Sequence, residues 1–154
     1  MTSEGTPGPA TAADLAGDIS FLLARANALS VASGNAALAP FGLKVRSYAV
    51  LALAAQDTRP SQREISEYLR LDPSQVVALV DDLQNRSLVS RQPDPADRRA
   101  NVVLITSEGR ELFGAAERSV AEAERVLHGE LDERERAQLS ELLGRLAFPR
   151  DARG

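Results

Sequence analysis

Residues 61–106 read SQREISEYLRLDPSQVVALVDDLQNRSLVSRQPDPADRRANVVLIT. Ser61 is followed three residues later by Glu64, which is the spacing of a capping box at the start of a helix. Asp72 and Gln75 repeat this spacing, and the proline between them suits the first turn of a helix. The first half of the stretch therefore predicts two helices joined by a tight turn.

The second half predicts a β-hairpin with a long tip. Residues 88–91 and 101–105 alternate or run apolar, as strands do. The two prolines of Pro93-Asp94-Pro95 are incompatible with a two-residue turn, so the loop between the strands should protrude. This loop carries two adjacent arginines, Arg98 and Arg99.

Helices are expected on both sides of this stretch. An amphipathic helix should run from Ala12 until Pro40 stops it. Residues 43–55 should form a buried helix, because its centre, YAVLALAA, is apolar nearly all round. Thr106 and Asp132 are suitable N-caps for a long helix and a last helix. We therefore predict a mainly α fold of six helices with one small β-hairpin.

The first helix has two interpretations, which the sequence leaves open. Its apolar residues recur at helical spacing and face either the core of the domain or a second subunit: Leu15, Ile19, Leu22, Ala26 and Leu29. The preceding residues, 1–11, are rich in Gly, Pro, Ser and Thr and are expected to be a disordered tail.

The composition narrows the classes of function. The 154 residues suit one domain with its own core, and they include no cysteine and one histidine, His128. Disulfides, thiolate metal sites, thiol sensing and a serine-type triad are therefore excluded, and we expect no metal, no cofactor and no enzymatic activity. Neither a membrane span nor a secretion signal is found, so the expected location is the cytoplasm.

The formal net charge is -4, but the charge is unevenly distributed. Residues 40–106 hold nine basic and eight acidic side chains, and the rest of the chain holds nine basic and fourteen acidic ones. Contact with phosphates depends on the local field, so the nearly neutral central segment is compatible with nucleic-acid binding that depends steeply on salt.

The outer face of the expected helix 73–86 is a candidate reader of duplex DNA, because an α-helix fits the major groove. Ser74 and Gln75 have side chains that hydrogen-bond base edges or phosphates, and Val77 could touch a thymine methyl group. The structural alternative is that Gln75 only completes the capping box and that Ser74 is solvated.

The hairpin supplies a second set of candidate DNA contacts. Arginine on a thin finger suits the minor groove, where the negative potential is focused. Arg98 and Arg99 lie at the tip, Arg91 lies on the incoming strand, and Arg86 lies just before it. The carboxylate of Asp97 could pair with one arginine and fix its geometry. The alternative is a charged hairpin whose ions only keep it soluble.

These motifs together resemble the MarR family of winged-helix transcription regulators. DPADRRANVVLITSEGREL, residues 94–112, is similar to the wing of that family and to the start of the helix that follows. VVALVDDLQNRSLVSR, residues 76–91, resembles its recognition helix and first wing strand. The resemblance covers residues 12–147.

The resemblance implies a winged helix-turn-helix fold and an obligate-type homodimer. Residues 12–39 and 107–148 would form a helical dimerisation region, and residues 40–106 would form the DNA-binding lobe. It also implies a near-palindromic operator in double-stranded DNA, repression, and release by a small organic ligand.

The resemblance also assigns roles to individual residues. Ser74, Gln75 and Val77 would face the major groove, Asp97 would orient the wing arginines, and Arg98 or Arg99 would enter the minor groove.

The chain departs from the family pattern on the helix 73–86. The family often has Thr-Arg where this chain has Val77-Ala78, and a basic residue where it has Asp82. Asp82 beside Asp81 would repel phosphates, which supports an alternative function: a winged-helix module that binds protein without specific DNA binding.

A small organic effector is the expected ligand, because the peroxide sensors and zinc sensors of the family use cysteines or several histidines that are absent here. The candidate ligand-binding residues combine apolar walls with one or two polar groups: Phe21, Leu22, Arg25, Phe41, Tyr48 and His128. For His128, a structural role near the end of a helix is the competing interpretation.

Overall fold

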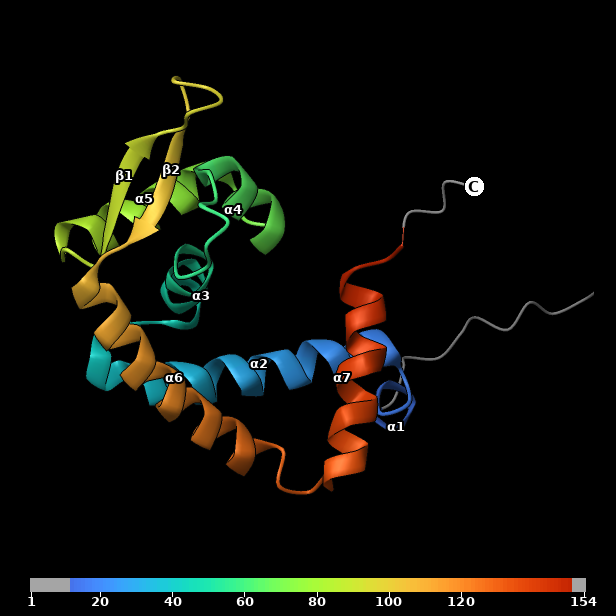
Figure 1. Ribbon diagram of the computed structural model, residues 1–154. Helices are drawn as coiled ribbons and strands as arrows, with labels where there is room; N and C mark the ends of the chain where they lie inside the picture. Colours follow the sequence, from blue (N-terminus) through green and yellow to red (C-terminus); the bar gives the residue numbers. More distant parts are fainter. Residues whose placement is uncertain (1–11, 151–154) are drawn as a thin grey trace, which may run out of the picture.

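The computed structural model describes residues 12–150, and the expected tail, residues 1–11, lies outside the described residues. The helices and strands follow one another as α1 (Ala12–Leu15), α2 (Ile19–Leu38), the 3-10 turn η1 (Ala39–Phe41), α3 (Val45–Ala54), α4 (Gln62–Leu69), α5 (Pro73–Asn85), β1 (Val89–Pro93), β2 (Asn101–Ile105), α6 (Ser107–Leu127) and α7 (Glu133–Ala147). Figure 1 shows the hairpin projecting at one end of the molecule, and α2 and α6 crossing side by side at the other.

The six predicted helices are all present, but the first is interrupted near its start. It divides into the four-residue α1 and the 20-residue α2, and the chain bends between them at Ala16-Gly17. Asp18 then caps α2, because its Oδ1 accepts a hydrogen bond from the backbone N–H of Phe21 at 2.8 Å. α2 ends at Leu38, just before Pro40, as predicted.

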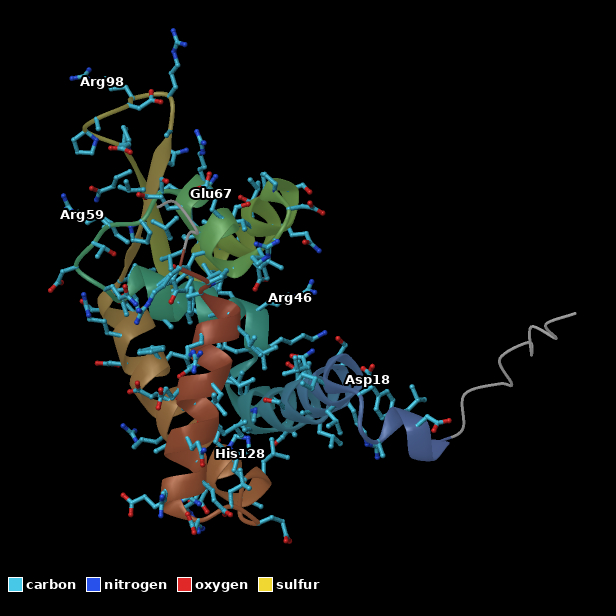
Figure 2. All side chains as sticks on the ribbon, turned by 90° about the vertical axis from the view of Figure 1, so that its right-hand side faces the viewer. Asp18, Arg46, Arg59, Glu67, Arg98 and His128 are labelled. Atoms are coloured by element: carbon cyan, nitrogen blue, oxygen red, sulfur yellow. The ribbon has the colours of Figure 1, made fainter. Side chains whose placement is uncertain are left out.

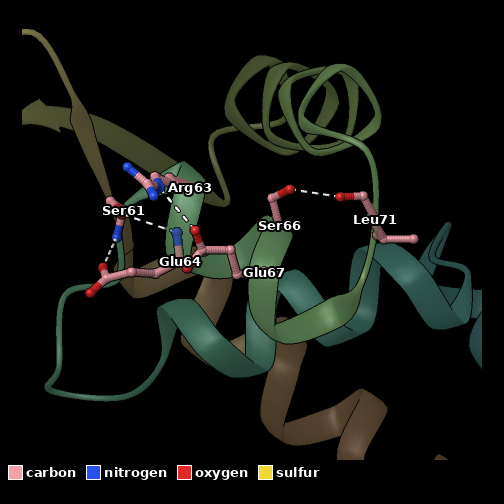
Figure 3. A network of polar contacts seen from close by, with 6 residues as sticks. All are labelled: Ser61, Arg63, Glu64, Ser66, Glu67 and Leu71. Atoms are coloured by element: carbon pink, nitrogen blue, oxygen red, sulfur yellow. Dashed lines mark hydrogen bonds and ion pairs between the residues drawn. The ribbon is translucent and has the colours of Figure 1, made fainter.

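The predicted capping boxes fix the starts of α4 and α5. Ser61 Oγ accepts from the backbone N–H of Glu64 at 3.1 Å, and Glu64 Oε2 accepts from that of Ser61 at 2.7 Å (Figure 3). Between the two helices, Ser66 Oγ donates to the carbonyl oxygen of Leu71 at 2.6 Å. The capping box therefore fixes the start of α4, and the Ser66 side chain holds the tight turn that follows the helix.

β1 and β2 pair antiparallel, with Val89 opposite Ile105 and Pro93 opposite Asn101. The sheet has one further contact that the sequence did not indicate. Ser61 forms an isolated bridge with Val102, and Val103 N–H donates to the carbonyl oxygen of Pro60 at 2.9 Å. The segment before α4 thus acts as a one-residue third strand, too short to leave an alternating pattern.

The core lies where α3, α4, α5 and the hairpin meet. Its largest fully buried side chains come from all of these elements and from the end of α2: Leu38, Val50, Leu51, Ile65, Val76, Val80, Leu83, Val89 and Val103. α6 adds Ala116, which is also fully buried, whereas α7 has no buried residue. The helix-turn-helix and the wing therefore share one hydrophobic core.

Two apolar faces remain exposed in the single chain. On α1 and α2 the exposed residues include Leu15, Leu22 and Leu29, and Ile19 is 70% exposed. On α7 the stripe consists of Leu139, Leu142, Leu143 and Leu146. The interpretation that the first helix directs this seam into the core of its own chain is therefore wrong. Within residues 12–150 no single helix is long and apolar enough to cross a membrane.

Gly109 makes the junction between the hairpin and α6 especially sensitive to substitution. A Cβ atom there would lie 2.1 Å from the carbonyl oxygen of Leu88, which already accepts two hydrogen bonds from Thr106. We expect Gly109→Ala to lower the free energy of unfolding by about 1–3 kcal/mol, because the backbone must shift.

Gly114→Ala, in the same helix, is the matched control. Its Cβ would meet only a terminal atom of Arg118, at 3.9 Å, so we expect a gain of about 0.5–1 kcal/mol from the better helix former. Urea unfolding at one fixed protein concentration measures both variants, and equal stability of the two would contradict this account of Gly109.

Candidate nucleic-acid interface

The outer face of α5 lies in solvent because the inner face is fixed in the core. Val76, Val80 and Leu83 are fully buried, while Ser74 and Gln75 are exposed. Gln75 Oε1 accepts from the backbone N–H of Asp72 at 3.2 Å, which leaves the amide NH₂ group as a donor toward solvent. Gln75 therefore caps the helix and still presents a hydrogen-bonding group on its outer face.

Val77, the third expected contact on α5, is 40% exposed. It projects from the same helix as Ser74 and Gln75, so these three predicted residues are brought together on one element. Their arrangement offers hydroxyl, amide and apolar groups to a partner that approaches along α5.

The loop between the strands is shaped by its two aspartates. Asp94 N–H donates to the carbonyl oxygen of Ala100 at 2.9 Å, and Ala100 N–H donates to that of Asp97 at 2.9 Å. Asp97 Oδ1 accepts from the backbone N–H of Arg99 at 3.0 Å, so the expected pairing of this carboxylate with a guanidinium is replaced by a backbone contact. The Asp97 carboxylate thus fixes the backbone of the turn at Arg99.

Arg98 and Arg99 are exposed at the tip of the loop, and Figure 2 shows Arg98 at the extreme end of the molecule. Within residues 12–150 neither guanidinium has a hydrogen bond or an ion pair. Both charges are therefore available to a partner outside the chain.

The guanidinium of Arg86 is occupied by protein acceptors. Its two Nη atoms donate to the carbonyl oxygens of Gly42 and Phe41, each at 2.8 Å. Gly42 has a φ of +63°, and a Cβ atom there would approach Arg86 Nη2 to 3.2 Å. Arg86 was expected to contact DNA, but in the free protein it ties the end of α5 to the turn that precedes α3.

Arg91 is occupied in the same way, and its side chain is only 19% exposed. Its Nη2 lies 2.6 Å from Asp81 Oδ1, and its Nε donates to Gln62 Oε1 at 2.5 Å. Gln62 was not singled out in the sequence, because 29 residues separate it from Arg91. The pairing also balances one of the two carboxylates that were expected to repel phosphates.

A concavity of about 660 Å³ lies beside α5. It is lined by residues of α2, α3 and α5 and of the segment before α3: Val31, Asn35, Gly42, Lys44, Val45, Arg46, Ser47, Gln75, Ala78, Leu79 and Asp82. Lys44 and Arg46 are exposed, and neither was among the predicted site residues. The sequence signal for them was weak, because two cations at the start of an apolar helix do not form a recognisable binding motif.

A second cavity, of about 160 Å³, lies between α2, α3 and α6 and is lined by Tyr48. The Tyr48 ring stacks on Phe113 with centroids 5.4 Å apart. Burial raises the pKa of the Tyr48 hydroxyl, and the carboxylates of Glu117 and Glu124 raise it further, so this group stays a hydrogen-bond donor.

Of the six expected ligand-binding residues, Tyr48 lines the second cavity, and neither that cavity nor the concavity beside α5 is lined by any of the other five. Phe41 packs against the core, and Figure 2 places His128 at the opposite end of the molecule from the wing tip. In the single chain the six residues therefore do not share either of these two cavities. The described part of the chain also contains no group of three His, Cys, Asp or Glu side chains that could hold a metal ion.

The sequence profile of the MarR family matches residues 41–100, which run from η1 to the end of the wing loop. A MarR-family transcriptional regulator from Rhodococcus sp. RHA1 has a similar structure, with a TM-score of 0.84 and 40% identity. The similarity covers 88% of this chain and 96% of that protein.

Two further structures extend the comparison to bound molecules. CouR from Rhodococcus jostii RHA1, solved with p-coumaroyl-CoA, is 38% identical with a TM-score of 0.80, over 88% of this chain and 95% of that one. A transcriptional repressor CouR bound to a 23-mer DNA duplex is 27% identical with a TM-score of 0.82, over 92% of this chain and all of that one. The winged helix-turn-helix, its exposed reading face and these similarities show that the chain belongs to the MarR family of transcription regulators.

Proposed function

We propose that this protein is a homodimeric repressor that binds a near-palindromic operator in duplex DNA. The observation that carries the proposal is the contrast between free and occupied groups. Ser74 and Gln75 on α5 and Arg98 and Arg99 on the wing face solvent with donors available, while Arg86 and Arg91 are bound within the protein. The free groups are those that would contact DNA.

α5 and the wing would engage different grooves of the duplex. The outer face of α5 would lie in the major groove, where Gln75 can donate to a base edge and Val77 can contact a thymine methyl group. Arg98 and Arg99 would reach the minor groove, with Asp97 holding the turn that presents them. Specificity would come from base contacts and from groove shape together.

The exposed apolar faces would form the dimer. Residues 12–39 and 107–148 would pack against the same regions of a second copy, which would bury the leucine stripes of α2 and α7. The lobe of residues 40–106 would then appear twice, and a twofold axis would place two half-sites roughly 10 base pairs apart, centre to centre. The protein would act in the cytoplasm, where its operator is accessible.

The concavity beside α5 is the proposed effector site. Its volume of about 660 Å³ is in the range of small-molecule sites, whereas the cavity at Tyr48, about 160 Å³, is too small for a drug-sized ligand. Lys44 and Arg46 would favour an anionic organic ligand, which is also the character of p-coumaroyl-CoA in the related CouR. A ligand there would touch α5 and oppose its fit to DNA.

One observation favours the alternative of a protein-binding module: Asp82 remains exposed on α5. Size-exclusion chromatography of the wild-type protein with and without its own upstream DNA separates the two functions. Co-elution with the DNA at low salt supports the repressor, and separate elution at every salt concentration supports the protein-binding module.

The wing arginines give the first test by substitution. We expect Arg99→Ala to weaken operator binding by about 1–3 kcal/mol, because one arginine contact in a groove is lost. Fluorescence anisotropy at one fixed salt concentration measures the change. Arg125→Ala removes the same charge from α6, where Arg125 pairs with Glu122, and should leave affinity unchanged. Equal affinities of the two variants would refute the assignment of the wing.

The dimer is tested on α7. Leu142 is 46% exposed within the apolar stripe, so Leu142→Glu would place a charge in the proposed interface. We expect sedimentation to show mostly monomer, with operator affinity reduced at least tenfold because one half-site holds the protein alone. Ser140→Glu adds the same charge on the opposite side of α7 and should remain dimeric. A Leu142→Glu protein that stays dimeric would contradict this interface.

The effector site is tested by titrating p-coumaroyl-CoA into the operator complex, with p-coumaric acid as the smaller comparison. We expect Arg46→Gln to raise the concentration of p-coumaroyl-CoA that releases half of the DNA by about tenfold, since a charge-assisted hydrogen bond is lost.

Arg25→Gln is the matched control for the effector test, because Arg25 was expected to bind ligand but does not line the concavity. Its response should equal that of the wild type. Greater loss of response in Arg25→Gln than in Arg46→Gln would place the effector elsewhere.

A further inference from the structure

Arg91 joins three elements of the DNA-binding lobe through one guanidinium. It lies on β1, at the base of the wing. Its Nε donates to Gln62 Oε1 of α4 at 2.5 Å. Its remaining contacts are all on α5: Val77 O at 3.3 Å, Gln84 Oε1 at 3.5 Å, and Asp81 Oδ1 at 2.6 Å.

The geometry of the guanidinium restricts how β1, α4 and α5 are oriented relative to one another. The group is planar and presents its N–H donors at fixed angles, so partners on α4 and α5 constrain the wing in orientation as well as in distance. The side chain is about four-fifths buried, and the Asp81 carboxylate keeps its charge compensated. An uncharged replacement would leave Asp81 unbalanced on the helix that faces DNA.

We propose that Arg91 is a positioning residue that sets the angle between the wing and α5, and thereby determines which DNA can be held in both grooves at once. The inference rests on the proposed DNA-binding function. A duplex whose groove geometry matches that angle accepts α5 and Arg98 or Arg99 together, whereas a mismatched duplex accepts one of them or must deform.

The contacts of Arg91 distinguish it from the wing-tip arginines. The Arg91 guanidinium is already held by Asp81 and Gln62, whereas Arg98 has no partner within residues 12–150. We therefore expect the loss of each kind of arginine to change the salt dependence of DNA binding differently. Loss of a phosphate contact reduces the slope of log K against log salt by about 0.9, and loss of a positioning contact leaves that slope unchanged.

The test measures affinity for the operator and for a scrambled duplex of equal length across a salt series. For Arg91→Gln we expect the ratio of the two affinities to fall about tenfold, which is the discrimination that one well-placed base contact supplies. The salt slope of this variant should equal that of the wild type. Arg91→Lys, which retains the charge opposite Asp81, should recover part of the ratio. Arg98→Gln is the comparison, and its salt slope should fall.

Asp81→Asn provides a second variant that leaves Arg91 in place, and thermal unfolding checks that each protein is folded. It should lower the ratio less than Arg91→Gln, because Gln62 and the Val77 carbonyl still hold the guanidinium. An Arg91→Gln protein with a reduced salt slope and an equal loss on both duplexes would make Arg91 a phosphate contact.

A folded Arg91→Gln or Asp81→Asn protein with an unchanged ratio would also overturn the proposal. If the wild-type protein binds neither duplex, the proposed DNA-binding function fails and the inference about Arg91 fails with it. The two failures are therefore distinguishable. A failure of the Arg91 proposal alone is seen in the variants, and a failure of the DNA-binding function is seen in the wild-type protein.

Discussion

The burial of one side of α5 is the constraint on which the rest of the interface depends. Val76, Val80 and Leu83 are fully buried among α3, α4 and the hairpin, so the helix cannot rotate without exposing them. This fixes which side chains face outward. It also explains why polar anchors gather around the ends of α5: the capping box at Asp72, and Arg86 at the other end, prevent the helix from sliding along its axis.

Features of this lobe that depend on neighbours in sequence could be predicted from the sequence. The capping boxes at Ser61 and Asp72, the protruding proline-containing loop, and the end of α2 before Pro40 all arise from contacts within a few residues. The apolar pattern did not predict the bend at Gly17, because Leu15 and Ile19 keep helical spacing across it. A hydrophobic period records which side of a helix is apolar, and it does not record whether the helix is continuous.

The chemical types of the residues at the candidate site could be predicted from the sequence, but their hydrogen-bond and ion-pair partners could not. Arginines on the wing and polar residues at the start of α5 could be identified from sequence, yet Arg86 and Arg91 are bound by groups 44 and 29 residues away. The expected ligand-binding residues other than Tyr48 do not line the cavities described above, and the reason is related. The concavity beside α5 exists only because α2, α3 and α5 cross there, and no local pattern places Asn35 opposite Lys44 and Gln75.

The net charge of -4 also has a different meaning once the pairs are known. Asp81 is balanced by Arg91, whereas Asp97 accepts only a backbone N–H and keeps its negative charge beside the wing arginines. Arg98 and Arg99 carry positive charges that have no partner within the described residues. The negative charge of Asp82 opposes them, because this residue is exposed on the edge of α5 that borders the concavity. Since exposed charges act over about one Debye length, roughly 8 Å in physiological salt, this local balance governs approach to DNA more than the total does.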